Sequence, residues 1–205
     1  MLREHCRVVI ARSAKRDEAI SIHMNEIKIT TPLTLDMRRR LKAGDEVLLT
    51  GTILTARDAA HQRLCDILKK GKPLPLNLKD AVIYYCGPTP ARPGRAIGSC
   101  GPTTSSRMDA FTPQLIRLGL GGMIGKGGRS EEVTDAIKKH RCVYFLAVGG
   151  IGALLSTKVR SSKVVLFSDL GPEAVYKLEV KDFPLLVAID SKGNNIYGKA
   201  GRKKK

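Results

Sequence analysis

The stretch SEEVTDAIKKHRCVYFLAV (Ser130–Val148) decides the fold class, because it predicts a helix over residues 130–140 that leads into an apolar strand over 142–148. The same alternation continues on both sides of this stretch. Helices are predicted over 105–118 and 150–158, strands over 120–124 and 163–168, and a strand-rich tail over 174–190. Alternating helices and strands indicate an α/β fold with a mixed, partly parallel sheet, whose sites lie in the loops that follow the strands.

The preceding part of the chain is richer in strands. A strand is predicted over Glu46–Gly51, with a continuation over Thr52–Leu54, and another over Ala81–Cys86. Apolar residues spaced by three and four predict a helix over Ala56–Lys69. The segment Gly87–Gly98 holds several prolines and glycines and no structural pattern, so we expect a loop, and long loops in compact domains usually have a function.

The 205 residues are enough for one well-buried main domain. Residues 1–20 lack a sustained apolar period and are expected to form an appended extension. The domain itself is expected over residues 21–199, followed by a basic tail at 200–205.

Several classes of protein are disfavoured by the composition. The longest apolar stretch, Val143–Leu155, is interrupted by glycines and is shorter than the roughly 20 residues that cross a bilayer. The charged start lacks the apolar core of a signal peptide, so a cytoplasmic location is expected. Five widely spaced cysteines favour free thiols over a disulfide framework, and the absence of a Cys-x-x-Cys pair predicts no metal site on this chain.

The net charge of +17 favours an anionic partner and raises the alternative of a nucleic-acid-binding module. Aromatic residues are only 4% of the chain and tryptophan is absent, so base-stacking platforms are scarce. Nucleic acid is therefore not the expected partner. Several cations instead stand beside glycines and threonines, which is typical of sites for small anions.

The segment Cys100–Asp109 combines a Gly101-Pro102 turn with four consecutive hydroxyl residues and Arg107. These hydroxyls are suited to capping the predicted helix, whose free N–H groups would then face an anion with Arg107 about one turn further on. The segment is therefore interpreted as an anion site, and the alternative is an ordinary helix cap.

Two glycine loops offer backbone amides. Gly121–Ser130 runs from a strand to a helix and contains Lys126, but it lacks the first glycine and the hydroxyl of a nucleotide P-loop. We expect either anion binding by Lys126 or a flexible loop. Gly149–Ala153 lacks the last glycine of a dinucleotide fingerprint and is interpreted as a site of close helix packing.

The third segment, Thr55–His61, places Arg57 and His61 one helical turn apart. Histidine titrates near neutral pH and is suited to general acid or base catalysis, while Arg57 is suited to hold a carboxylate. A structural role for His61 is the alternative. Taken together, the three cationic segments favour a small polyanion such as a dicarboxylate.

At these positions the sequence resembles one known family. The matching motifs are Gly101-Pro102-Thr103-Thr104-Ser105-Ser106-Arg107-Met108-Asp109, Gly125-Lys126-Gly127, Thr55-Ala56-Arg57-Asp58-Ala59-Ala60-His61, Glu173-Ala174, Val180-Lys181-Asp182-Phe183-Pro184 and Gly193-Asn194. In this order, from about residue 25 to 198, they resemble the β subunit or carboxyl-terminal domain of class I fumarate hydratase and the β subunit of L(+)-tartrate dehydratase.

The resemblance implies a swivelling β/β/α domain, like the mobile domain of aconitase, that docks on an α subunit. The α subunit would hold a [4Fe-4S] cluster with one open iron as Lewis acid. A heterotetramer of two α and two β subunits is the expected assembly. The reaction would be the reversible hydration of fumarate to malate, or alternatively the dehydration of L-tartrate to oxaloacetate. A scaffold without activity, descended from such subunits, is a further alternative.

The resemblance also implies roles for particular residues. Those that match substrate-binding positions are Arg57, Arg107, Lys126 and Thr104, and those that match catalytic positions are Thr103 and His61. An unassisted threonine hydroxyl is too weakly acidic to act as a base at neutral pH, so Thr103 needs a partner that takes its proton. His61, Asp58 or a carboxylate of the α subunit remain open for that role.

Overall fold

The computed structural model describes residues 26–147 and 152–199. Its strands are β1 (Ile27–Thr30), β2 (Glu46–Thr55), β3 (Val82–Tyr84), β4 (Gly122–Gly125), β5 (Val143–Leu146), β6 (Val159–Leu166) and β7 (Val175–Ile189). Its α-helices are α2 (Leu35–Arg40), α3 (Asp58–Lys69), α4 (Thr112–Arg117), α5 (Glu131–His140) and α6 (Gly152–Thr157). Three short 3₁₀ segments are η1 (Ser105–Met108), η2 (Ser168–Glu173) and η3 (Tyr197–Lys199).

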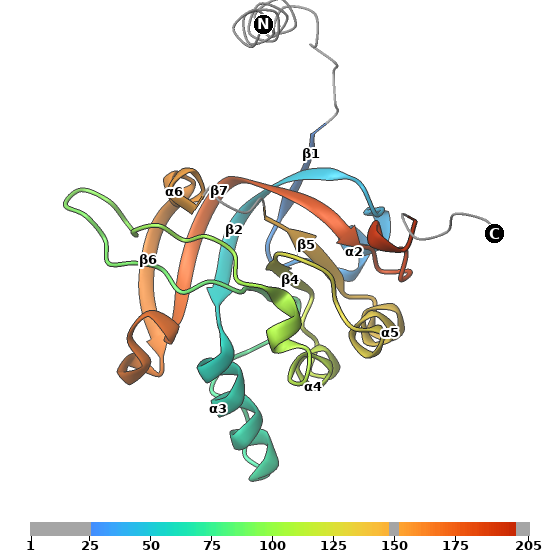
Figure 1. Ribbon diagram of the computed structural model, residues 1–205, viewed down its shortest axis with the longest axis horizontal. Helices are drawn as coiled ribbons and strands as arrows, with labels where there is room; N and C mark the ends of the chain where they lie inside the picture. The colour runs from blue at the N-terminus through green and yellow to red at the C-terminus, as the bar shows by residue number, and fades with distance from the viewer. Residues whose placement is uncertain (1–25, 148–151, 200–205) are drawn as a thin grey trace, which may run out of the picture.

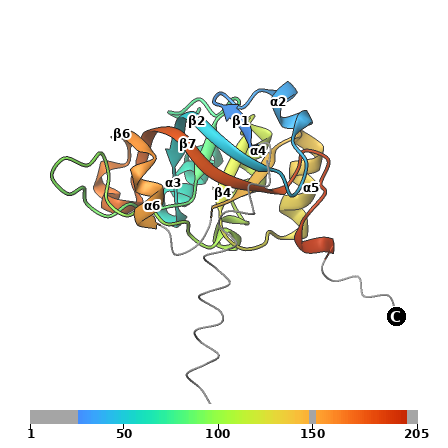
Figure 2. The same ribbon diagram turned by 90° about the horizontal axis from the view of Figure 1, so that it is seen from above.

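The strands form one mixed sheet in the order β1-β2-β3-β4-β5-β7-β6. Neighbouring strands from β1 to β5 run parallel, whereas β7 is antiparallel to both β5 and β6. The long strand β7 also pairs with β2, so the sheet closes on itself (Figures 1 and 2). The predicted α/β class with a mixed, partly parallel sheet is confirmed.

The apolar side chains form two clusters, one for each face of the central strands. The first consists mainly of strand residues, such as Leu49, Phe145 and Phe183. The second joins the opposite face of β3, β4 and β5 to helices α3, α4 and α5, which lie on one side of the sheet (Figure 1). Because both faces are covered, these strands are apolar throughout rather than alternating.

The prediction of one continuous helix over residues 105–118 is wrong. The structure has the four-residue η1 and a separate α4, joined by a turn. Pro113 explains the break, because proline lacks the N–H that would continue the hydrogen-bond ladder and fits only the first turn of a helix, where it stands in α4.

The other predicted elements are present with shifted ends. The predicted strand over 163–168 begins earlier, as β6, and the strand-rich tail is the single strand β7. Gly87–Gly98 is a loop without helix or strand, as predicted. Of the predicted close-packing segment Gly149–Ala153, residues 149–151 lie outside the described residues. Close packing is confirmed at Gly152, where a Cβ atom would lie 2.7 Å from the Gly101 nitrogen. The expected extension at 1–20 and the tail at 200–205 lie outside the described residues.

Candidate active site

The predicted site segments follow the carboxyl ends of three adjacent parallel strands. Arg57 comes two residues after β2, and Lys126 comes directly after β4. Between them, the N–H of Thr103 donates to the carbonyl of Tyr85, the residue that follows β3. Carboxyl ends of parallel strands share one edge of a sheet, so three segments that are distant in sequence meet there.

The first contact joins the threonine loop (residues 103–109) to the lysine loop (residues 126–130). The N–H of Lys126 donates to the carbonyl of Thr103 at 3.2 Å, and the N–H of Ser105 donates to the carbonyl of Lys126 at 2.9 Å. These bonds form an isolated parallel bridge between Thr104 and Lys126. Thr103, Thr104 and Lys126 are therefore held together by their backbones.

This bridge corrects the predicted helix-capping role of the threonine loop. The expected helix start is a 3₁₀ turn of only four residues, and the Thr104 side chain makes no capping bond. The N–H groups of Thr103 and Ser105 are already bonded to carbonyls. Anion binding at this loop therefore depends on its side chains rather than on a helix terminus.

The second contact joins the two arginines of the predicted site through Asp58. Arg107 Nε donates to Asp58 Oδ1 at 2.9 Å, and Arg57 Nη2 lies 3.7 Å from Asp58 Oδ2. The Arg107 side chain is 52% exposed and that of Arg57 is 23% exposed, so both side chains remain partly accessible from outside. The carboxylate thus holds two cations side by side without removing them from the surface.

A further carboxylate, Glu173, orients Arg57 from a distant part of the chain. Its Oε1 lies 3.3 Å from Arg57 Nη2, and its Oε2 accepts the N–H of Ala59 in the first turn of α3 at 3.0 Å. A Cβ atom on Gly87 would lie 3.0 Å from Arg57 Nη1, so Gly87 leaves room for this guanidinium. The sequence showed Glu173 only as a motif of the family resemblance, since nothing local connects it to Arg57.

His61 lies in the interior rather than at the surface of the site. Its side chain is fully buried, its Nδ1 lies 2.8 Å from the carbonyl oxygen of Arg57, and its Nε2 has no hydrogen-bond partner among the described residues. Burial lowers the pKa of His61 to about 4; the hydrogen bond to Arg57 opposes this shift and the charge of Arg129 adds to it. His61 is therefore neutral at pH 7.

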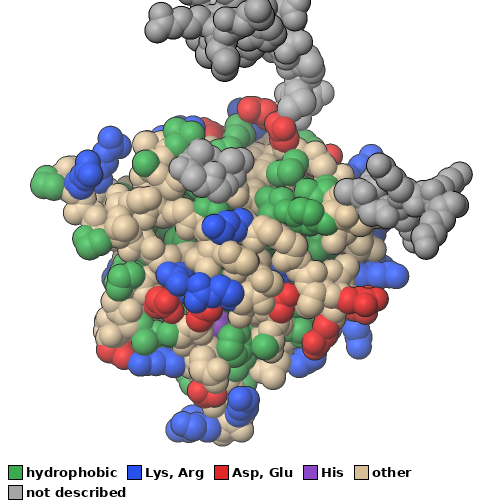
Figure 3. Space-filling view, in the orientation of Figure 1, with side chains coloured by type: hydrophobic (Ala, Val, Ile, Leu, Met, Phe, Trp, Pro, Cys, Tyr) green, Lys and Arg blue, Asp and Glu red, His purple; other side chains and the backbone are tan. Residues whose placement is uncertain are grey.

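The electrostatic balance of the site favours an anion. The site segments carry three cations, Arg57, Arg107 and Lys126, and the two carboxylates Asp58 and Glu173 contact only the arginines. Lys126 is exposed and has no ion pair among residues 26–147 and 152–199. Basic and acidic side chains also lie next to one another near the start of α3 on the surface in Figure 3. An incoming carboxylate therefore finds at least one cation that is not neutralised.

The described cysteines do not fit an iron-sulfur cluster. Cys65, Cys86, Cys100 and Cys142 are all buried, and burial raises the pKa of the Cys100 and Cys142 thiols to about 12. Metal ligation requires the thiolate form. Among the described residues, moreover, no three His, Cys, Asp or Glu side chains are grouped as metal ligands.

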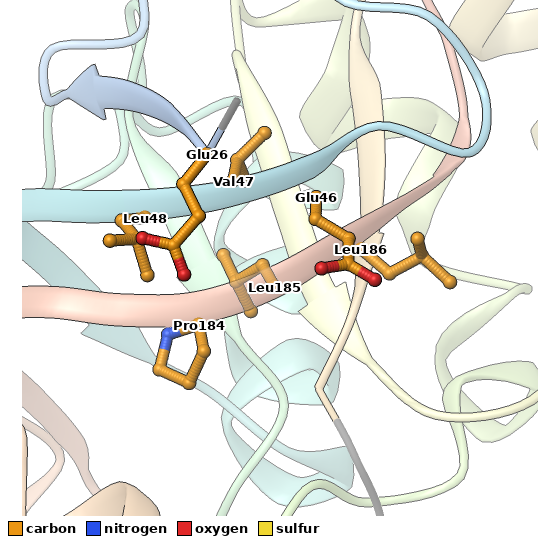
Figure 4. Close-up of a pocket in the computed structure, with 7 residues that line it drawn as sticks. All are labelled: Glu26, Glu46, Val47, Leu48, Pro184, Leu185 and Leu186. Carbon is orange, nitrogen blue, oxygen red and sulfur yellow. The ribbon is translucent and has the colours of Figure 1, made fainter. Parts of the chain in front are cut away.

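A hollow of about 260 Å³ lies elsewhere, over β2 and β7 (Figure 4). Its lining is apolar apart from the carboxylates of Glu26 and Glu46, so a dicarboxylate would meet charges of its own sign there. None of the predicted site residues lines it.

In the described ranges, no helix is long and apolar enough to span a bilayer.

Comparison with known proteins supports the family resemblance over nearly the whole chain. Residues 3–200 match the model of the Fumarase C-terminus family, and this match begins inside the segment expected to be an extension. The chain is 35% identical over 229 residues to fumarate hydratase 2 of Leishmania major, covering 95% of this chain and 40% of that protein. It is 39% identical over 191 residues to the aerobic class I fumarate hydratase of Escherichia coli K12, covering 91% of this chain and 34% of that protein.

A third relative is similar in length. The chain is 42% identical over 171 residues to the putative L(+)-tartrate dehydratase subunit beta of Methanocaldococcus jannaschii, covering 80% of this chain and 88% of that protein. The chain thus spans two fifths or less of the two fumarate hydratases but most of the tartrate dehydratase subunit. Because the family match covers residues 3–200 of 205, the chain belongs to the Fumarase C-terminus family, together with class I fumarate hydratases and the β subunits of L(+)-tartrate dehydratases.

Proposed function

We propose that this chain is the β subunit of a hydro-lyase that reversibly hydrates fumarate to malate. The observation that carries the proposal is the grouping of Arg57, Arg107, Thr103 and Lys126 at the carboxyl ends of β2, β3 and β4. A four-carbon dicarboxylate has two anionic ends and a reacting centre between them, and this group combines three cationic residues with a hydroxyl residue.

Within this proposal, each cation has a task. Arg57 and Arg107 hold one carboxylate, because a planar guanidinium matches a carboxylate with two parallel hydrogen bonds. Lys126 binds the other carboxylate as a point charge, and the exposed Thr104 adds a hydroxyl beside it. Thr103 is assigned the movement of the proton.

The proton partner of Thr103 is proposed to lie on the α subunit. His61 is fully buried and neutral, and its Nδ1 faces the Arg57 carbonyl. Asp58 already accepts a hydrogen bond from Arg107 and lies 3.7 Å from Arg57 Nη2, so its carboxylate is engaged by two arginines. These two observations favour a carboxylate of the α subunit over both residues and leave His61 the structural role of supporting Arg57.

The same proposal places the [4Fe-4S] cluster on the α subunit, which is expected to pair with this chain in a heterotetramer of two α and two β subunits. The support is twofold. The described cysteines are buried thiols, and the cations of the site lie open on the surface, so another wall is needed to exclude water from a reaction centre. Cysteines free of disulfides agree with a reducing compartment such as the cytoplasm.

L-tartrate is the second candidate substrate. The match to 88% of the putative L(+)-tartrate dehydratase subunit beta of Methanocaldococcus jannaschii favours it, because that relative is named for tartrate. Both substrates carry two carboxylates on four carbons, so the cation group serves either one.

The test is to reconstitute this chain with an α subunit under anaerobic conditions, with iron and sulfide, and to follow fumarate absorbance and oxaloacetate formation in the same sample. Turnover of fumarate or malate supports the first candidate, and oxaloacetate from tartrate supports the second. We expect the isolated chain to be colourless and inactive. Full activity of the isolated chain after treatment with a chelator would contradict the proposal.

A further inference from the structure

The threonine loop and the lysine loop are separate in sequence, yet the proposed function requires a fixed distance between Thr103, Arg107 and Lys126. Their backbone bridge at Thr104 provides only two hydrogen bonds, at 2.9 and 3.2 Å. Both loops are partly exposed. A second connection is therefore needed to hold the arrangement rigidly, and Arg129, three residues after Lys126, provides it.

Arg129 reaches from the lysine loop to the end of the threonine loop. Its Nε donates to Asp109 Oδ1 at 2.7 Å, its Nη2 to Thr112 Oγ1 at 2.7 Å and its Nη1 to the Tyr85 hydroxyl at 3.2 Å. The rings of Tyr85 and Tyr144 lie 5.2 and 5.1 Å from the guanidinium carbon, close enough for cation–π attraction. The Arg129 side chain has no exposed surface, so it does not reach a bound substrate.

Three further hydrogen bonds complete the connection. The second oxygen of Asp109 accepts the N–H of Ser130 at 2.7 Å, which attaches the threonine loop to the backbone of the lysine loop. The Tyr144 hydroxyl contacts Ser105 Oγ at 2.9 Å and the Gly127 carbonyl at 2.8 Å, again one partner from each loop. Every one of these contacts crosses between the two loops or fixes a residue that does.

We infer that Arg129 is a positioning residue, which fixes Lys126 relative to Thr103 and Arg107 through its buried pair with Asp109. This inference rests on the proposed function, because the distance between the loops matters only if Lys126, Thr103 and Arg107 act on the same substrate. A misplacement of about 1 Å in a catalytic arrangement costs roughly 100-fold in rate, so a rigid connection has a measurable value.

A purely structural ion pair is the competing explanation, and the chain contains a matched control. Arg38 forms a second buried arginine–carboxylate pair, with Asp80, and its side chain is 7% exposed. Replacement by lysine keeps the charge at either position but loses the planar fork with its several donors. Arg129→Lys and Arg38→Lys therefore impose the same chemical change at two places.

The first measurement is amide hydrogen exchange of the full chain. In Arg129→Lys, we expect the N–H groups of Lys126 and Ser105 to exchange about 10- to 100-fold faster, because the bridge between the loops opens more often. In Arg38→Lys, these two amides should keep their wild-type rates. Asp109→Asn serves as a second variant with the same expected direction. Unchanged rates in Arg129→Lys and Asp109→Asn would overturn the inference.

The second measurement is a double-mutant cycle in the reconstituted complex of α and β subunits. Arg129→Lys should lower kcat/KM about 30-fold, mainly through a higher KM, and only about threefold or less in a Lys126→Ala background. Arg38→Lys should leave kcat/KM within about twofold of wild type. An equal loss in both backgrounds, or an equal loss from Arg38→Lys, would show that Arg129 acts only on stability.

The two measurements separate this inference from the proposed function. A wild-type complex without turnover on fumarate or tartrate would contradict the proposed function, while hydrogen exchange would still decide whether Arg129 fixes the two loops. Turnover by wild type together with additive losses in the cycle would retain the function and reject the positioning role.

Discussion

Two buried arginine–aspartate pairs stand at opposite ends of the parallel strands. Arg38 and Asp80 pair at the amino end, just before β3, and Arg129 and Asp109 pair at the carboxyl end, just after β4. The arginine side chains are 7% and 0% exposed, so the two pairs are nearly equal in burial.

Their surroundings differ. Besides Asp80, Arg38 donates to the carbonyl of Arg141, in the turn before β5, and so fastens two turns that bear no predicted site residue. Arg129 donates to the side chains of Asp109 and Thr112 and follows the exposed Lys126 by three positions. The comparison shows that the same kind of buried pair connects structural turns at one end of the sheet and, at the other end, two loops that carry exposed charged residues.

Arg107→Ala gives the largest effect expected from this comparison. Removal of one partner of a charged hydrogen-bonded contact costs about 4 kcal/mol in binding, so kcat/KM of the reconstituted complex should fall about 1,000-fold. The thermal midpoint should change little, since the Arg107 side chain is 52% exposed. The control is Arg117→Ala, which removes an exposed arginine of α4. A similar loss of kcat/KM in this variant would show that the effect is not specific to the arginines at the carboxyl ends of the strands.

Asp80→Asn tests the opposite end. Leaving Arg38 buried without its charge partner should lower the free energy of unfolding by about 2 to 3 kcal/mol, less than for a fully buried pair, because Asp80 keeps 23% exposure. Denaturant titration measures this value. Turnover per folded complex should stay at the wild-type level, and a loss of activity without a loss of stability would contradict the structural role of this pair.

His61, which is buried in α3 near the carboxyl end of β2, should make the stability of the fold depend on pH. Its pKa is about 4 in the folded chain, against 6.5 for an ordinary histidine, so only the unfolded chain binds the proton between these values. Stability is therefore full above pH 6.5 and is lost as pH falls toward 4, by on the order of 3 kcal/mol.

His61→Asn keeps a donor for the Arg57 carbonyl but does not titrate. Its unfolding free energy, measured by denaturant titration at several pH values, should therefore be less steep between pH 6.5 and 4 than that of wild type. Equal pH dependence of variant and wild type would refute the burial of a neutral histidine.

Glu173→Gln gives the smallest effect. The variant keeps an acceptor for the N–H of Ala59 but loses the charge beside Arg57, so the guanidinium is oriented less strictly and KM should rise about tenfold with little change in kcat. Asp169→Asn, in the same 3₁₀ segment, is the matched control, because Asp169 pairs with the exposed Arg63 instead. Steady-state kinetics of both complexes measure the two KM values. An equal rise in KM in Asp169→Asn would show that the effect does not come from the contact between Glu173 and Arg57.

Local patterns predicted much of the fold and part of the site. The helix over 56–69, the loop over Gly87–Gly98 and the long apolar strands depend on periodicity and on turn residues, which act over a few positions. Arg57, Arg107 and Lys126 were recognisable as cations beside hydroxyls and glycines. The continuous helix over 105–118 was wrong because Pro113 fits only at a helix start.

The sequence by itself determined the α/β class, the three cationic segments and their family. The tertiary structure alone decided which carboxylates accompany those cations, since Glu173 lies 114 residues from its contact in α3, and that His61 is buried and neutral. It also decided that Arg129 is hidden while Lys126 is exposed, three positions apart. The physical reason is that desolvation and ion pairing depend on what packs around a side chain, and that packing is set by strand order.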